Sequence, residues 1–92
     1  MSRNKIHRCL RFNPNVTYFK PQGIPLNILE EVVLLPEEIE ALKLYEVDLL
    51  DQTNAAQKMK ISQPTFARIL DSANKKVAEA LVRGKAIRIE SK

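Results

Sequence analysis

The sequence predicts a mainly α-helical domain with a helix-turn-helix core and short β-strands at its N- and C-terminal ends. Three observations predict this fold. First, Ser62-Gln63-Pro64 combines a side chain that can cap a helix with a proline in the first turn, and apolar residues then recur at spacings of three and four. Second, a short helical pattern over 52–59 directly precedes this one. Third, residues 85–90 alternate between polar and apolar, which is typical of a strand.

The size and composition indicate one small globular domain. The chain has 92 residues, of which 45% are hydrophobic and 28% charged, so it can bury a single core and is not expected to be disordered throughout. Cys9 is the only cysteine, which excludes an intramolecular disulfide. The sequence contains no apolar run of transmembrane length and no signal peptide pattern, so we expect a cytoplasmic protein that does not contact a membrane.

The charges are segregated along the chain. Residues 1–29 hold five Lys or Arg and no acid, and residues 30–51 hold eight acids and Lys43 as the only base. Residues 52–92 hold nine basic residues and three acids. Clustered cations favour contact with a polyanion such as double-stranded DNA, although most charge runs are simply solvated faces.

Residues 1–35 are predicted to form a basic N-terminal arm. A weak strand pattern lies within 8–12 and a second over 16–19. Pro21 and Pro25 around Gly23 exclude a helix and indicate an extended connector over 20–26. The arm can form a hairpin or lie across the core. The apolar cluster over 28–35 is expected to pack under the helices that follow.

Residues 36–92 are predicted to form the helix-turn-helix core, joined to the arm in a single globular unit. Pro36 opens a helix that runs to Glu46, and its acids are expected to be solvated and to favour the helix dipole. Asp51 caps the helix over 52–59, Lys60 lies in the turn, and Ile61 enters the core. The third helix covers about 63–82 before Gly84 and should bury one stripe, consisting of Phe66, Ile69, Leu70, Ala73, Val77, Ala80 and Leu81.

The terminal strand over 85–90 needs a pairing partner. Residues 8–12 can supply one, and so can the same segment of a second subunit. The second pairing would make the protein a homodimer. Two copies would also multiply the number of base pairs that the protein could recognise.

The exposed side of the third helix carries groups suited to nucleic acid. Gln63, Thr65 and Arg68 offer an amide, a hydroxyl and a guanidinium, which are groups that recognise base edges, and Ser72 lies on the same exposed side. Basic residues further along are candidates for phosphate contacts, namely Lys75, Lys76, Arg83 and Lys85.

Other chemistry has little support in the sequence. His7 and Cys9 could contribute to a metal site, but a zinc site takes four ligands and one chain offers no further pair at suitable spacing. Ligands shared between subunits keep this hypothesis open. The chain has two glycines, neither in a phosphate-binding loop, and no nucleophile with a base and an orienting group. We therefore expect no enzyme activity, no metal and no cofactor.

Several segments resemble a known family. They include Val16-Thr17-Tyr18-Phe19-Lys20-Pro21-Gln22-Gly23-Ile24-Pro25-Leu26, Glu38-Ile39-Glu40-Ala41-Leu42 and Ser62-Gln63-Pro64-Thr65-Phe66-Ala67-Arg68-Ile69-Leu70. Together they are similar to a small prokaryotic family of predicted DNA-binding proteins of unknown function, whose helix-turn-helix resembles region four of sigma-70-type factors. The resemblance implies that Pro64 and Ala67 face the DNA groove together with Gln63, Thr65 and Arg68. Ser72, on the same exposed side, is a further candidate to face the groove. Leu49 and Lys60 stand where the family pattern often has glycine.

The sequence thus leads to two hypotheses from different classes. In the first, the protein is a sequence-specific DNA-binding transcriptional regulator with the helix over 63–82 in the major groove. In the second, it is a protein-interaction module whose acidic block over 30–51 binds a basic partner, such as an RNA polymerase subunit or another transcription component, without a specific DNA site of its own.

Overall fold

The computed structural model of the chain describes residues 16–25 and 28–90. In chain order the elements are β1 (Val16–Phe19), β2 (Glu31–Leu34), α1 (Pro36–Leu42), a π-helical turn η4 (Lys43–Val47), α2 (Gln52–Met59), α3 (Gln63–Arg83) and β3 (Ala86–Glu90). The fold is therefore mainly helical with a small sheet, as predicted. The predicted bounds of α2 agree with the structure, and α3 ends within a residue of its predicted end.

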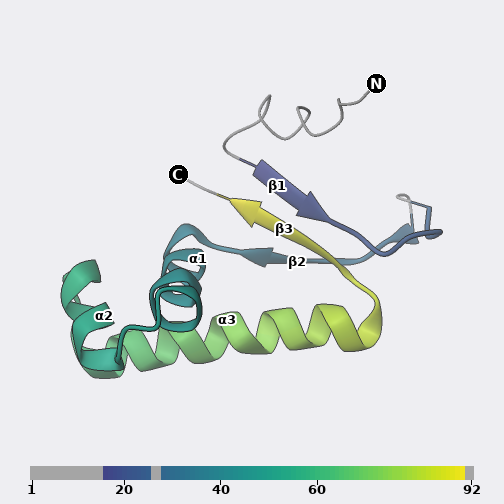
Figure 1. Cartoon of the computed structure of the whole chain (residues 1–92). Helices are drawn as coiled ribbons and strands as arrows, with labels where there is room; N and C mark the ends of the chain where they lie inside the picture. Colours follow the sequence, from purple (N-terminus) through teal and green to yellow (C-terminus); the bar gives the residue numbers. More distant parts are fainter. Residues whose placement is uncertain (1–15, 26–27, 91–92) are drawn as a thin grey trace.

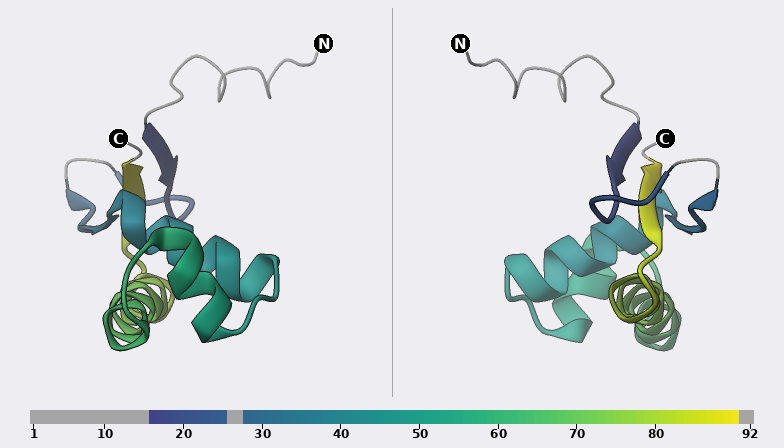
Figure 2. Two further views of the ribbon diagram at one scale, coloured as in Figure 1. Left: turned by 90° about the vertical axis from the view of Figure 1, so that its left-hand side faces the viewer. Right: turned by 90° about the vertical axis from the view of Figure 1, so that its right-hand side faces the viewer.

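The long helix α3 organises the molecule. The three strands lie along one side of α3, while α1 and α2 gather at its N-terminal part (Figure 1). Seen along α3, the sheet and the pair α1–α2 occupy different sectors around the helix (Figure 2). Within the described part of the chain, no helix combines the length and the apolar character that crossing a bilayer requires.

The C-terminal strand β3 lies in the centre of the sheet. It pairs antiparallel with β1, where Ile87 faces Phe19, and parallel with β2, where Ile87 faces Val32. The strand prediction for this segment is confirmed, but its partners differ from the predicted ones. Both edges of β3 are used by β1 and β2, and residues 8–12 lie outside the described residues. The pairing requirement that motivated the homodimer is thus met within one chain.

The strand β2 was expected only as part of an apolar cluster. Its four residues, Glu31–Leu34, include three consecutive apolar side chains, which hide the alternation that marks a strand. The segment becomes a strand through its pairing with β3, which is distant in sequence and is not indicated by the local pattern. The distant segments 16–34 and 86–90 are consequently tied into one sheet.

The core lies between the three helices. Phe66 is its largest fully buried side chain, and the Tyr45 ring packs against it with centroids 6.4 Å apart and a tilt of 57°. Buried Ala55 and Ala56 bring α2 close to α3, as their small size predicts. The other buried members of this cluster are Ala41, Leu44 and Leu70.

The predicted apolar stripe of α3 is correct except at its last member. Phe66, Leu70, Ala73 and Ala80 are buried, and Ile69 and Val77 are half-buried. Leu81 was expected in the core but is 75% exposed. The reason is geometric, because each helical residue is rotated by about 100° from the one before, so burial of Ala80 turns Leu81 toward the edge of the packed face.

A carboxylate joins β2, α1 and α3. The Glu38 Oε1 accepts hydrogen bonds from the Leu35 backbone N–H at 2.9 Å and from the Lys76 Nζ at 2.8 Å, and Oε2 accepts one from the Ser72 hydroxyl at 2.6 Å. The same Lys76 ammonium donates to the Val33 carbonyl at 2.7 Å. Glu38 was expected to be solvated, yet it is only 4% exposed.

The partners of Glu38 decide its charge state. Burial alone would raise the pKa of the Glu38 carboxyl, but the hydrogen bonds from Leu35, Lys76 and Ser72 outweigh it and hold the pKa below its usual range. The folded protein therefore keeps Glu38 ionised, and this ionised form is the one that holds β2 and α3 together.

Loss of the Glu38 charge should destabilise the fold in a pH-dependent way. An unperturbed Glu titrates near 4.5 and the folded pKa lies lower, so the stabilisation is complete above pH 4.5 and is lost as pH falls through the folded pKa. Because Lys76 is 31% exposed, Glu38→Gln should cost about 3 kcal/mol at pH 7, at the low end of the range for a broken buried pair. Urea unfolding from pH 3 to pH 7 measures both effects.

The control for this experiment is Glu37→Gln, at the exposed neighbouring position. It should keep the wild-type acid dependence, whereas Glu38→Gln should flatten it. Equal acid sensitivity in the wild type and Glu38→Gln would remove Glu38 from this role.

Candidate nucleic-acid interface

The start of α3 is fixed by its cap. Ser62 Oγ accepts a hydrogen bond from the Thr65 N–H at 3.3 Å, and the Ser62 hydroxyl donates to Thr65 Oγ1 at 2.9 Å. Pro64 lies in the first turn, where its missing N–H leaves no hydrogen bond unmade. Sequence and structure agree on this cap, and the exposed residues that follow it are held in a defined orientation.

The turn between α2 and α3 is a left-handed helix end. The Lys60 N–H donates to the Gln57 carbonyl at 3.0 Å and the Ile61 N–H to the Ala56 carbonyl at 3.1 Å, which is a Schellman arrangement. Lys60 has φ 61°, a conformation that favours glycine. Half-buried Ile61 then anchors the turn to the core, as the sequence predicts.

A residue in the left-handed conformation also ends a helical segment at two other places. Gly84 ends α3 with φ 70°, and Leu49 follows η4 with φ 63°. The Lys85 N–H reaches the Ala80 carbonyl, whereas the Leu50 N–H reaches back one residue further, to Leu44, because η4 has a wider turn. Leu49 and Lys60, the two positions where the resembled family often has glycine, are thus the two left-handed non-glycine residues among those described.

We call the exposed start of α3 the α3 tip, consisting of Gln63, Pro64, Thr65, Ala67 and Arg68. Gln63, Pro64 and Arg68 are exposed, and Thr65 and Ala67 are half-buried. Within residues 16–25 and 28–90 the Arg68 guanidinium forms no ion pair. The α3 tip therefore presents hydrogen-bonding groups to solvent, while Phe66 on the opposite side of the same turn is fully buried.

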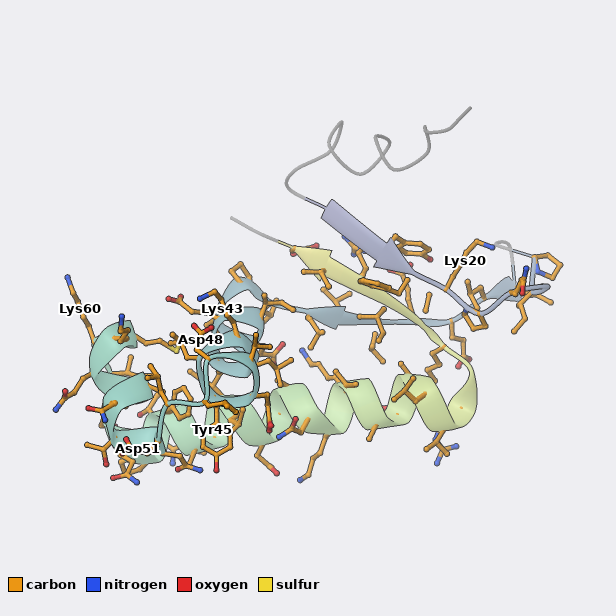
Figure 3. All side chains as sticks on the ribbon, viewed as in Figure 1. Lys20, Lys43, Tyr45, Asp48, Asp51 and Lys60 are labelled. Atoms are coloured by element: carbon orange, nitrogen blue, oxygen red, sulfur yellow. The ribbon has the colours of Figure 1, made fainter. Side chains whose placement is uncertain are left out.

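The Gln63 side chain is oriented by α2. The Thr53 hydroxyl donates to Gln63 Oε1 at 3.4 Å, which leaves the amide NH₂ of Gln63 directed elsewhere. This role of Thr53 could not be predicted from the sequence, because the contact depends on how α2 crosses α3. Lys60 was not among the predicted contact residues either, although its side chain projects away from the body of the molecule in the turn next to the α3 tip (Figure 3).

The predicted phosphate-contacting residues separate into three groups. Lys75 is 78% exposed, and it forms an ion pair with exposed Asp71 at 3.2 Å. An ion pair between two exposed side chains is weak, so Lys75 can exchange Asp71 for another anion at little cost. Spacings of three and four along Pro64, Arg68, Asp71 and Lys75 place these residues on one face of α3. The structure thus brings Lys75 to the same face as the α3 tip.

Lys76 and Ser72 point inward instead. Both were predicted to face nucleic acid, but both bind Glu38, and Lys76 also binds the Val33 carbonyl. Their polar groups are used to join elements of the fold. Sequence periodicity could not reveal this role, because the acceptors lie more than thirty residues away.

Arg83 and Lys85 lie at the other end of α3. Fifteen residues separate Arg83 from Arg68, which is about 22 Å along a helix. Lys85 pairs with Glu79 and, at 3.5 Å, with Glu30. The hydrogen bond to Glu79 raises the pKa of Lys85 above its usual value. The structure does not bring these two residues to the α3 tip, and His7, Cys9 and the first fifteen residues of the arm lie outside the described residues.

Comparison with known proteins identifies the family. Residues 1–91 match the family described as protein of unknown function DUF134. The chain belongs to this family. A UPF0251 protein of Caldanaerobacter subterraneus subsp. tengcongensis is 56% identical over 90 residues, covering 98% of this chain and 76% of that protein.

Two further relatives extend the comparison. A UPF0251 protein of Moorella thermoacetica is 56% identical over 90 residues, covering 98% of this chain but 60% of the relative. One from Dehalococcoides mccartyi is 54% identical over 86 residues, covering 91% of this chain and 74% of the relative. No solved structure matches the chain. Family membership is consistent with the resemblance noted from the sequence, and the family description leaves the function open.

The left-handed turn residue offers a test of local strain. Lys60→Gly should stabilise the fold by about 0.5–1 kcal/mol, because glycine adopts the left-handed conformation without a steric penalty. Part of this gain is offset because glycine also increases the conformational entropy of the unfolded chain. Lys60→Ala, which keeps the penalty while removing the charge, is the matched control and should be close to neutral. Chemical denaturation of the three proteins measures the difference; a destabilised Lys60→Gly would contradict it.

Proposed function

We propose that this protein binds double-stranded DNA in a sequence-specific manner and acts as a transcriptional regulator, with the α3 tip in the major groove. The observation that carries the proposal is the α3 tip itself. Hydrogen-bonding side chains are exposed there on a helix start that is capped by Ser62 and anchored through buried Phe66. A rigid helix end of this kind fits the width of the major groove, and α2 with the turn at 60–62 completes a helix-turn-helix.

The proposed contacts follow from the chemistry of the α3 tip. Arg68 matches the two acceptors on the major-groove edge of guanine, and Gln63 can pair with adenine through its amide. The Thr65 hydroxyl already accepts from Ser62, so it is free to donate to a base or a phosphate. Pro64 and Ala67 supply apolar surface at the groove floor, where a thymine methyl is the natural partner.

Phosphate contacts would come from the cations around the α3 tip. Lys75 lies on the same face as Arg68, and exposed Lys58 and Lys60 flank the turn. Each such contact releases counterions from DNA, so the proposed binding weakens steeply as salt concentration rises. Lys76 is not included, because its ammonium is held by Glu38 and Val33.

The alternative of an acidic docking module has less support. Several acids of the block over 30–51 have internal partners: Glu31 with Tyr18 and Arg88, Glu38 with Lys76, Asp48 with Lys43, and Asp51 with the α2 backbone. Their charge is partly neutralised or used for capping. A basic partner would therefore meet a weaker acidic surface than the sequence suggests, whereas the α3 tip keeps its polar groups exposed.

The role of Arg68 can be tested on a selected DNA site. Selection of bound sequences from a random duplex pool should return a consensus, and Arg68→Ala should then cost about 1–3 kcal/mol of discrimination at one base pair. Gel-shift titration against the consensus and single-base variants measures this loss. Lys43→Ala is the control, because it also removes one positive charge but one that is already paired with Asp48.

The outcomes separate the hypotheses. A consensus, together with relaxed preference in Arg68→Ala and unchanged preference in Lys43→Ala, supports the proposal. Absence of any DNA retention at low salt would refute it and favour the protein-interaction module. If Arg68→Ala discriminates between bases as well as the wild type does, the proposed base contact of Arg68 is wrong, but the proposed DNA binding is not refuted.

Lys75 should behave differently from Arg68. If Lys75 contacts a phosphate, Lys75→Ala should weaken binding to all sequences equally and reduce the slope of log affinity against log salt by about 1. Fluorescence anisotropy between low and moderate salt, on the consensus and on an unrelated duplex, distinguishes the two variants. A sequence-dependent loss in Lys75→Ala would contradict a phosphate contact.

A further inference from the structure

The hydrogen bonds at the start of α3 use the side-chain oxygens of residues 62, 63 and 65. The Thr53 hydroxyl donates to Gln63 Oε1 at 3.4 Å, and the Ser62 hydroxyl donates to Thr65 Oγ1 at 2.9 Å. Ser62 Oγ in turn accepts the Thr65 backbone N–H at 3.3 Å. Each of these three oxygens therefore already accepts a hydrogen bond within the chain.

The donors of the same side chains remain available to a ligand. The Gln63 amide keeps both N–H groups, because the Thr53 contact takes its oxygen. The Thr65 hydroxyl accepts from Ser62 and so keeps its own hydrogen. Arg68 is exposed, and a guanidinium has donors and no acceptor. The contacts within the chain thus make the α3 tip a surface that mainly offers donors.

A donor surface distinguishes among the bases in the major groove. Guanine presents two acceptors there, N7 and O6, and no donor. Adenine and cytosine each present an amino group, which needs an acceptor on the protein. A glutamine amide that can turn freely pairs with adenine by accepting from N6 and donating to N7. In this chain the Gln63 oxygen is bonded to Thr53, so adenine would have to displace or share that contact.

Asp71 is an acceptor on the same face of α3, but it does not replace the Gln63 oxygen. Its carboxylate pairs with Lys75 at 3.2 Å. Eight residues separate Asp71 from Gln63, which is about 12 Å along a helix. Stacked bases follow one another at about 3.4 Å. Asp71 therefore lies too far along α3 to serve the base pair that Gln63 contacts.

We propose that Thr53 is a positioning residue that holds Gln63 as a hydrogen-bond donor, so that the α3 tip selects guanine rather than adenine at the base that Gln63 contacts. The inference rests on the proposed DNA binding and specifies which bases it recognises. Thr53 contacts no base in this arrangement. It acts through Gln63, and α2 thereby contributes to sequence preference without entering the groove.

The strength of the Thr53 contact sets the size of the effect. One neutral hydrogen bond changes an equilibrium by a factor of about two to ten. The Thr53–Gln63 contact is long and joins two exposed side chains, so its effect lies in the lower part of this range. We expect Thr53 to contribute about threefold to the preference of Gln63 for guanine over adenine.

The experiment uses the full chain and sites selected from a random duplex pool. Gln63→Ala identifies the base pair that Gln63 contacts, because this variant loses its preference there. Fluorescence anisotropy then compares two duplexes that carry guanine or adenine at that position. The wild type should favour guanine, and Thr53→Val should lower the guanine-to-adenine affinity ratio about threefold, because valine keeps the shape of threonine but has no donor.

Two controls separate positioning from a general structural effect. Thr53→Ser keeps the hydroxyl and should retain the wild-type ratio. Thr53→Val added to Gln63→Ala should leave the ratio of Gln63→Ala unchanged, because Thr53 acts only through the Gln63 amide. Thr53 is exposed on α2, and thermal unfolding of each variant verifies that the fold is kept.

A measurement without DNA tests the contact itself. In ¹⁵N-resolved NMR spectra of the free chain, the side-chain NH₂ resonance that disappears in Gln63→Ala belongs to Gln63. This resonance should shift in Thr53→Val and stay in place in Thr53→Ser.

The outcomes distinguish this inference from the proposed function. A guanine preference that falls in Thr53→Val, together with the shifted Gln63 resonance, supports it. An adenine preference in the wild type, an unchanged ratio in Thr53→Val, or an unmoved Gln63 resonance would overturn it while leaving DNA binding intact. Absence of DNA retention at low salt would instead refute the proposed function, and the base preference with it, even where the NMR spectra verify the Thr53 contact.

Discussion

The ionised carboxylate of Glu38 is the interaction on which the rest of the structure depends. It receives hydrogen bonds from the chain entering α1 and from Ser72 and Lys76 on α3, and Lys76 carries the connection on to β2. Few apolar side chains are fully buried in the described part of this short chain, so the polar junction at Glu38 also holds the sheet and the helices together. Such a junction tolerates little change, because removing one partner leaves another buried polar group unsatisfied.

The contacts of Glu38 with Ser72 and Lys76 lie midway along α3, and the two halves of the helix on either side of them have different surroundings. Toward the N-terminus, the core around Phe66 fixes the helix while its opposite face is left polar and exposed. Toward the C-terminus, the sheet covers one side and the outer side becomes apolar at Leu81 and Val82. A single rigid element thus connects a polar exposed surface at its start with an apolar exposed surface at its end, and the distance between the two is set by the number of helical residues.

The sequence predicts the parts of this structure that depend on near neighbours. The bounds of α2, the Ser62 cap, the Gly84 end of α3 and the strand at 86–90 all follow from residues within a few positions of one another. The partners of β3 and the inward direction of Lys76 do not, because they depend on contacts between segments 38 or more residues apart. The same limit applies to Leu81, which continues the apolar spacing but lies where no other element covers it. In the candidate interface, Gln63 and Arg68 could be identified as exposed, whereas the orienting contact from Thr53 required the crossing of α2 over α3.

The central place of β3 has a consequence for the order in which the chain folds. β1 and β2 do not pair with each other, and both take their hydrogen bonds from the last strand of the described chain. On the ribosome, the segment from α1 to α3 can form its local contacts early, while both N-terminal strands remain without a partner until residues 86–90 have emerged. Of the described elements, β1 and β2 thus wait longest for their partner, and the sheet closes only when β3 has joined them.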